Sequence, residues 1–447
     1  MRQLDSQPAE VTTRATDDDL RRVIRVRDGL AVAVGIVIGA GILRTPGLIA
    51  GYLGDARLIL GVWLLGGIIA GLSTLLLAEM AAALPTAGGK YVYAKEAWGP
   101  VAGFVAGWAE VIVSRGFSGA SKAVVIATYA TELAGRGSIP ALAGTVVVAF
   151  TMLHLGGLKF GTRFQNITTI LKIAVLLGIA AAGFMAGDAT GFSERMAVNP
   201  EYAGLLGFAL AYQSVAFAYY GWEDAAKMAE EVRDPGRSLP RILIGGAAAV
   251  AFLYLLINVA FLFALTPAEM AGSTLVARDA VAATFGDATG RIVQVAGLII
   301  LLSSANVNFL ATPRVAFALA RDGLAPQLLT RVSSRGTPTY ALFVVSAVIF
   351  VLAVSGTFET LIRFMMLVAI SVDLIVFLGF FRLRSKRPDL HRPLRVPLHP
   401  VLPALTVLLY VIVLGIIVFT QPELAVGGAL MLLALFSAGY FTARRQA

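Results

Sequence analysis

The chain has 447 residues, of which 58% are hydrophobic and 14% are charged; a soluble domain carries about 25% charged residues, so the composition indicates a protein with many membrane-spanning helices. The net charge of +9 does not indicate nucleic-acid binding, because most basic residues lie in loops between apolar runs, where they act as topology signals. The chain has no cysteine, which excludes disulfides, a thiolate nucleophile and a cysteine-ligated metal.

The first 28 residues are polar, show no cleavable signal peptide and are expected to form a cytoplasmic tail. Apolar runs long enough to cross a bilayer follow. We predict twelve spans, at about 29–53, 58–83, 100–131, 140–158, 164–187, 203–226, 242–266, 290–320, 339–355, 358–381, 401–420 and 424–442. The longer connections are predicted as an amphipathic segment at 86–98, a charged loop at 227–241 and an outer segment with a short helical piece at 267–289.

Basic residues predict the orientation of the spans. If the N-terminus is inside, the loop between the tenth and eleventh spans is also inside. This loop contains Arg382, Arg384, Lys386, Arg387, Arg392 and Arg395. The outer loops then contain little more than Arg57, Arg136, Arg195 and Arg278. Because cytoplasmic loops carry an excess of lysine and arginine, both termini are predicted to lie in the cytoplasm, with the protein in the inner (cytoplasmic) membrane.

The first span contains an expected break. Gly39 and Gly41 flank Ala40 near its middle, and glycine is the poorest helix former after proline. A break at membrane depth is tolerated only where the freed backbone lines a cavity or is buried in protein. The N–H groups that begin the second half-helix can then hold a carboxylate. Close helix packing through small residues is the competing interpretation.

The sixth span contains a second expected break. Its centre, from residue 214 to 224, reads Ser-Val-Ala-Phe-Ala-Tyr-Tyr-Gly-Trp-Glu-Asp, which places acidic and aromatic residues at the end of an apolar run. Interrupted helices in corresponding positions of two halves are the best sequence pointer to the central site of a transporter. No identity between the halves is visible, so the repeat is inferred from the order of the spans.

Four motifs in the right order resemble the amino acid–polyamine–organocation superfamily, close to the L-type amino acid transporters. They are Gly39-Ala40-Gly41-Ile42, the stretch from Ala78 to Tyr93, the stretch from Gly221 to Pro240, and the stretch from Pro313 to Gly323. The resemblance covers nearly the whole chain. It implies an all-α membrane fold of the leucine-transporter type, with a ten-helix core of two inverted halves at 29–381 and two peripheral helices with a short tail at 382–447.

The same resemblance implies a secondary active transporter of L-amino acids that works by alternating access, without enzymatic activity or a cofactor. The implied substrate site contains Ile36, Val37, Gly39, Ala40, Gly41, Ile42, Phe217, Ala218 and Tyr219. The backbone N–H groups of the second half-helix would hold the carboxylate, and carbonyls of the two broken helices would hold the ammonium. Phe217 resembles the aromatic gate of the family; its competing role is packing.

Lys172 lies in the middle of the fifth span. A lysine at bilayer depth is costly and is by default a functional hypothesis; the alternative is a lysine that snorkels toward the interface. By resemblance to sodium-independent members, Lys172 would stand where sodium sits in others. It would contact carbonyls near Gly35 and Ile36 and the hydroxyl of Ser303 or Ser304. Proton symport and amino acid exchange both stay open.

The third span departs from the family in its charged residues. Arg115 and Lys122 are seven residues apart, on about the same helical face, and Glu110 lies about one turn before Arg115. Deep cations need partners, and the candidates are Glu110, Glu223, Asp224 and Asp373. These residues form either a structural ion-pair network or a contact to the substrate side chain, which would shift specificity toward acidic or polar substrates.

Other functions are weighed against this hypothesis. A polyamine or organic-cation exchanger and a non-transporting amino acid sensor share the same fold. A membrane enzyme is disfavoured, because no Ser–His pair, nucleotide loop or metal cluster is visible. The expected partners are an amino acid and the lipid bilayer, and whether protons are also bound stays open. Neither nucleic acid nor a disulfide-linked accessory subunit is expected. The sequence does not decide between a monomer and a homodimer.

Overall fold

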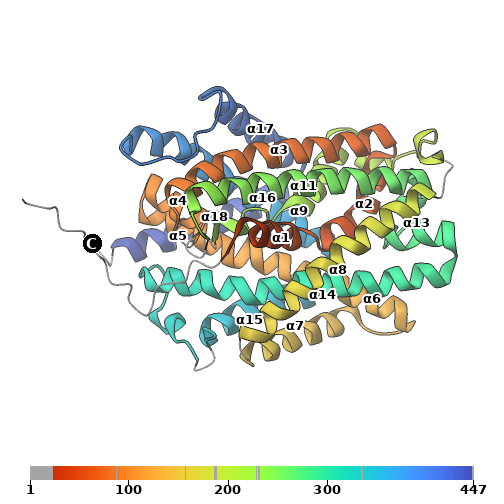
Figure 1. The fold of residues 1–447 in the computed structure, drawn as a ribbon, viewed down its shortest axis with the longest axis horizontal. Helices are drawn as coiled ribbons and strands as arrows, with labels where there is room; N and C mark the ends of the chain where they lie inside the picture. Colours follow the sequence, from red (N-terminus) through yellow and green to blue (C-terminus); the bar gives the residue numbers. More distant parts are fainter. Residues whose placement is uncertain are drawn as a thin grey trace, which may run out of the picture.

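The structure is a computed structural model that describes residues 24–444, apart from 87, 157, 186–188, 228, 230–231 and 334–335. Within this part all regular elements are helical, and most helices run along the long axis of the molecule (Figure 1). Most of the predicted N-terminal tail and the acidic pair at 230–231 of the third motif lie outside the described residues.

The first half of the chain forms elements that follow the predicted spans closely. They are α1 (Val26–Val37), α2 (Ala40–Leu53), α3 (Ala56–Ala83), α4 (Lys90–Trp98), α5 (Pro100–Trp108), the π-helix η1 (Ala109–Phe117), α6 (Ser118–Ala134), α7 (Ile139–Leu155) and α8 (Leu158–Met185). Two short 3₁₀ turns, η2 (Thr190–Phe192) and η3 (Pro200–Tyr202), lie in the loop that follows.

The second half continues in the same way. Its elements are α9 (Leu205–Tyr219), α10 (Asp224–Lys227), α11 (Pro235–Ala264), α12 (Pro267–Ala271), α13 (Val276–Phe285), α14 (Asp287–Arg321), η5 (Gln327–Thr330), α15 (Thr339–Ser355), α16 (Phe358–Lys386), α17 (Val401–Thr420) and α18 (Pro422–Arg444).

The described residues form a multi-pass membrane protein. Eight helices are long and apolar enough to cross a bilayer, and α1 with α2 makes a ninth span if the bent pair is counted as one. The shorter apolar helices α7, α9 and α15 occupy the predicted fourth, sixth and ninth spans. The total of twelve spans and the inverted repeat stay predictions.

Three of the predicted boundaries or connections differ from the structure. Helix α11 begins at Pro235, inside the predicted charged loop, because proline is well suited to the first helical position. Helix α16 continues to Lys386, where Arg384 forms an ion pair with buried Glu79 of α3. The outer connector contains two helices, α12 and α13, where one short piece was expected.

Helices α5, η1 and α6 form one continuous run, Pro100–Ala134, with a π-helix inside it. In an α-helix, residues five positions apart are separated by about 140° around the axis. A π-helix, with i→i+5 hydrogen bonds, brings such residues close to each other. Nothing in the local sequence predicted this segment, which contains Glu110 and Arg115.

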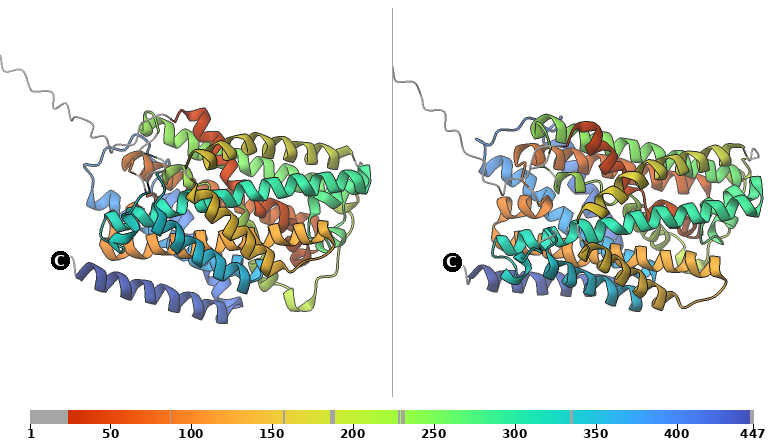
Figure 2. Two further views of the ribbon diagram at one scale, coloured as in Figure 1. Left: turned by 90° about the horizontal axis from the view of Figure 1, so that it is seen from below. Right: turned by 60° about the horizontal axis from the view of Figure 1, so that its bottom comes forward.

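The two half-helices α1 and α2 meet at an angle of 42° and follow each other along the long axis at mid-height in Figure 1. Helix α1 packs against α11, and α2 packs against α9, so the break is enclosed by helices from the second half of the chain. Helix α18 lies along the outside of the bundle in both views of Figure 2, and only 11% of its apolar window is buried. This position fits a peripheral helix that faces lipid.

Candidate functional site

The break between α1 and α2 falls at Ile38 and Gly39. The last carbonyls of α1 have no partner inside the helix, and side chains from other helices satisfy two of them. Lys172 of α8 donates from Nζ to the Gly35 carbonyl at 2.9 Å. Tyr254 of α11 donates from its hydroxyl to the Val37 carbonyl at 3.0 Å. The broken end is therefore held in place by two neighbouring helices.

Helix α2 begins beside two close contacts. A Cβ on Gly41 would lie 2.4 Å from the Cα of Ala218 on α9, and a Cβ on Gly39 would lie 2.2 Å from Ser304 Oγ on α14. Both glycines thus allow neighbouring helices to approach, as the packing interpretation expected, and they also stand at the break. The backbone N–H groups of Ala40, Gly41 and Ile42 are the first of α2 and lack partners within the helix.

The sixth predicted span breaks at the end of α9. The helix stops at Tyr219, and Gly221 takes a φ of +119° in the turn that follows. Phe217 is buried and packs edge-on against Phe358, with ring centroids 5.6 Å apart. Tyr219 instead donates its hydroxyl to the Trp63 carbonyl at 3.2 Å. Tyr219 therefore belongs to an aromatic cluster beside the break.

A small cavity joins the two breaks. It is lined by Ile36, Val37, Gly39, Ala40, Gly41, Ser118, Lys122, Phe217, Tyr220, Ser304 and Met365. These include six of the nine predicted substrate residues; Ile42, Ala218 and Tyr219 are not among them. The cavity volume is ≈ 20 Å³, which holds a water molecule but no amino acid. A larger molecule could enter only if the surrounding helices moved apart.

Lys172 is fully buried inside the protein and does not reach outward as a snorkelling lysine would. In the part of the chain that is described, no carboxylate lies within 4.0 Å of its Nζ. One turn earlier on α8, Thr168 shares a hydrogen bond of 2.6 Å with Ser303 of α14. Helix α8 is thus connected to both α1 and α14 by polar contacts.

A charged network lies next to the cavity and consists of Lys90, Glu110, Arg115, Glu223, Asp224, Lys227 and Asp373. Arg115 donates from Nε to Glu110 at 2.7 Å and also contacts Asp224. Lys227 contacts the same two carboxylates. The π-helix brings Glu110 and Arg115 together, although an α-helix would turn them apart.

The second part of the network is centred on Lys90 at the start of α4. Its Nζ lies 2.6 Å from Asp373 of α16 and 3.2 Å from Glu223. Asp373 therefore pairs with Lys90, and among the described residues no ion pair within 4.0 Å joins it to the cations of the third span. The hydroxyl of Tyr220 accepts a hydrogen bond from Lys90 at 3.1 Å and lies 3.1 Å from Ser114 Oγ.

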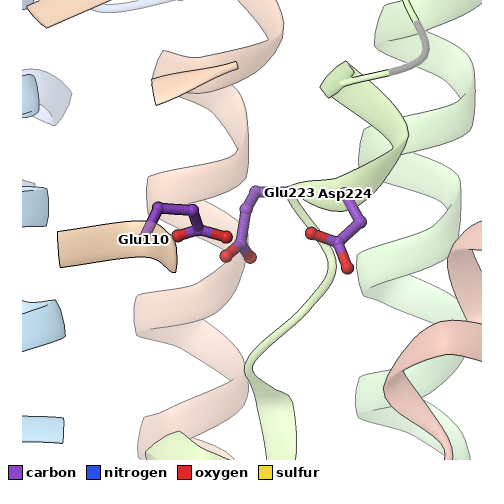
Figure 3. Close-up of side chains that lie close together, drawn as sticks. All are labelled: Glu110, Glu223 and Asp224. Carbon is purple, nitrogen blue, oxygen red and sulfur yellow. The ribbon is translucent and has the colours of Figure 1, made fainter. Parts of the chain in front are cut away.

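Three carboxylates of the charged network come close enough together to bind a cation. Oxygens of Glu110, Glu223 and Asp224 lie within 4.8 Å of one another, and Figure 3 shows the three side chains gathered at one point. Arg115 and Lys227 are already bound to this group. A cluster in which ammonium and guanidinium groups neutralise the acids is an ion-pair network and offers no separate metal site.

The two cations of the third span have different surroundings. Seven residues separate them by about 10 Å along a helix, so Arg115 lies in the charged network and Lys122 lies at the cavity. Lys122 Nζ donates to the Ser304 carbonyl at 3.3 Å. Among the described residues, no acidic side chain lies within 4.0 Å of it, so none of the four predicted carboxylate partners contacts Lys122.

Another polar contact joins α4 to the end of α14. Asp322 accepts hydrogen bonds from Tyr91 and, at 2.7 Å, from Lys95. Partial burial raises the pKa of the Asp322 carboxyl, but these two hydrogen bonds and the nearby positive charge outweigh burial, so the pKa lies below its usual value. Helix α4 lies at the end of the bundle where the C-terminus is marked (Figure 1).

The chain is similar to known proteins over most of its length. The sequence model of the family described as amino acid permease matches residues 27–440. The serine/threonine exchanger SteT of Bacillus subtilis (strain 168) is 29% identical over 411 residues, which cover 91% of this chain and 93% of that protein. The Asc-type amino acid transporter 1 of Mus musculus is 30% identical over 397 residues, which cover 85% of this chain and 73% of that protein.

A third relative extends the similarity further. The large neutral amino acids transporter small subunit 2 of Mus musculus is 28% identical over 443 residues, which cover 96% of this chain and 82% of that protein. By their names, these three relatives carry amino acids, and none of the three is named as an enzyme.

Proposed function

Because the chain belongs to the amino acid permease family, near the L-type amino acid transporters, we propose that it is a secondary active transporter that carries L-amino acids across the cytoplasmic membrane by alternating access. Amino acid transport is the activity of the family. The observation that supports the mechanism is the cavity at which the α1–α2 break meets the end of α9. Broken helices that meet at membrane depth are how transporters of this kind build a central site.

The proposed binding mode follows from the polarity of the helix ends. The substrate carboxylate binds the N–H groups of Ala40, Gly41 and Ile42, because a helix N-terminus carries positive partial charge. The substrate ammonium binds carbonyls at the end of α1, near Ile36, and at the end of α9, near Phe217. Phe217, buried at the cavity wall, acts as the gate that moves to admit substrate.

The proposed transport cycle needs no sodium. Lys172 places an ammonium on the Gly35 carbonyl at the end of α1, where sodium would otherwise connect α1, α8 and α14. Two unit charges about 4 Å apart repel by about 4 kcal/mol at an effective dielectric of 20, so a protonated Lys172 and a sodium ion exclude each other.

For the coupling mode we propose amino acid exchange, which the name of the Bacillus relative supports; proton symport is the second candidate. The proposed architecture has twelve spans in two inverted halves with two peripheral helices. Both termini lie in the cytoplasm, as the basic loops favour.

The experiment is uptake of labelled amino acids by liposomes that contain only this protein. We expect uptake in sodium-free buffer, stimulated by amino acid preloaded on the other side. If an inward proton gradient stimulates uptake without preloaded amino acid, the coupling mode is proton symport and not exchange. Strict dependence on sodium would contradict the role of Lys172. Binding without any uptake would identify a sensor, and uptake of polyamines alone would identify an organic-cation exchanger.

A further inference from the structure

We propose that Lys122 is a specificity-determining residue which binds the side-chain carboxylate of the substrate, so that the preferred substrates are acidic amino acids. This inference rests on the proposed function and adds the substrate class to it. Lys122 lies on α6, in the middle of the continuous helix Pro100–Ala134, and its side chain lines the cavity at the two breaks.

The first observation is that Lys122 is a buried lysine without an acidic partner among the described residues. Its side chain is 8% exposed, and its hydrogen bond goes to a neutral acceptor, the carbonyl of Ser304. The four acids of the charged network contact Lys90, Arg115 and Lys227. Within the described residues, no carboxylate is left for Lys122. An isolated buried charge is costly, so a carboxylate that arrives with the substrate would stabilise the charged form of Lys122.

The second observation concerns Ser304, which brings Lys122 and the start of α2 into one site. Its carbonyl binds Lys122, while its Oγ lies 2.2 Å from where a Cβ on Gly39 would stand. This Oγ is buried and has no hydrogen-bond partner among the described residues. The cavity wall therefore offers both a charged donor and an unused hydroxyl close to the break.

The chemistry of the site favours a substrate with two carboxylates. The N–H groups at the start of α2 take the α-carboxylate, and Lys122 then binds a second carboxylate through a charge-assisted hydrogen bond. A neutral amino acid would occupy only the carboxylate position at the start of α2 and would offer Lys122 no carboxylate. Lys172 does not fill this role, because it binds the Gly35 carbonyl and does not line the cavity.

The experiment compares substrates of nearly equal size that differ in charge. Liposomes that contain the protein are given labelled glutamate or glutamine, and then aspartate or asparagine. We expect the wild type to take up each acid at least about tenfold better than its amide, as expected for a hydrogen bond to a charged group. In Lys122→Met this ratio should fall about tenfold or more, and Lys122→Arg should retain part of it.

Arg115→Met is the matched control, because it removes a buried cation from the same helix at a position outside the cavity. The Arg115→Met variant should show the same ratio of acid uptake to amide uptake as the wild type. If Lys122→Met cannot be purified, the melting temperature of the wild type tests the inference without it. Glutamate should raise this temperature more than glutamine does. A wild type that favours the amides, or is stabilised by them more strongly, overturns this inference and leaves amino acid transport intact. Failure to carry any amino acid refutes the proposed function as well.

Discussion

The helix from Pro100 to Ala134 contains two buried cations, and they differ in how far their charge is compensated. Arg115 contacts Glu110 and Asp224 inside the charged network. Lys122 contacts a backbone carbonyl at the cavity. A charge that is satisfied inside the protein contributes to the fold and has little capacity left for a ligand. A charge that lacks an acidic partner, beside a cavity, is a candidate for recognition. Depth in the membrane alone does not distinguish the two.

Lys172 extends this comparison to a third buried basic residue, and its removal is expected to have the largest effect on uptake. Lys172→Ala removes the hydrogen bond to the Gly35 carbonyl. Hydrogen bonds to charged groups contribute about 1.5–3 kcal/mol, so uptake should fall tenfold or more. Uptake by reconstituted protein measures this. Normal uptake in Lys172→Ala would show that the α1–α8 contact is dispensable.

Arg115→Met tests the compensated side of the comparison. Removing one partner of a buried ion pair costs about 3–5 kcal/mol, because the remaining charges stay buried. The melting temperature should fall equally with and without substrate, and the ranking of substrates should not change. Removing Glu110 at the same time, as Glu110→Gln, should restore part of the stability. An unaltered melting temperature together with an unaltered ranking would show that Arg115 has neither role.

Tyr254→Phe tests whether the α1 end needs its neutral partner as well as its charged one. The substitution removes the hydroxyl that donates to the Val37 carbonyl and keeps the aromatic contact with Trp63. A neutral hydrogen bond contributes about 1 kcal/mol, so substrate affinity should weaken severalfold. The melting temperature measured at increasing substrate concentrations gives this affinity. The mutant Tyr212→Phe, on α9, is the control for loss of a buried tyrosine hydroxyl that is not bonded to the break.

Asp322→Asn is expected to have the smallest effect. The carboxyl has a lowered pKa in the folded protein, so it stabilises the fold above its unfolded pKa of about 3.9 and loses this contribution as the pH falls through the lower folded value. The group is partly exposed to solvent, which screens its charge, so the contribution at pH 7 should be below about 1 kcal/mol. Melting temperatures of wild type and Asp322→Asn should differ slightly at neutral pH and converge in acid. A gap that widens in acid would contradict this assignment.

The main features of the break could be predicted from local sequence. Gly39 and Gly41 weaken the helix wherever they occur, and a lysine in an apolar run, as at Lys172, is conspicuous by composition alone. The local sequence therefore identifies these positions without their tertiary contacts.

The partners of the buried charges could not be predicted in the same way. Lys90 lies on the segment predicted as amphipathic, and it is 4% exposed because its acidic partners come from α16 and from the turn after α9. The close contact of Glu110 with Arg115 depends on a π-helix, which tertiary packing selects over the usual α-helix. Tyr254 lies on α11 among many apolar residues, and only the position of the α1 end gives its hydroxyl a role.

Tyr220 belongs to two sites at once. Its side chain lines the cavity, while its hydroxyl accepts a hydrogen bond from Lys90 in the charged network. Thermodynamic linkage requires that coupling between two binding events is reciprocal. If substrate in the cavity changes how strongly the network holds a proton, then protonation changes substrate affinity by the same factor. Substrate affinity measured as a function of pH therefore gives the coupling free energy. A coupling free energy near zero would mean that substrate binding in the cavity and protonation of the charged network are independent, although Tyr220 contacts both.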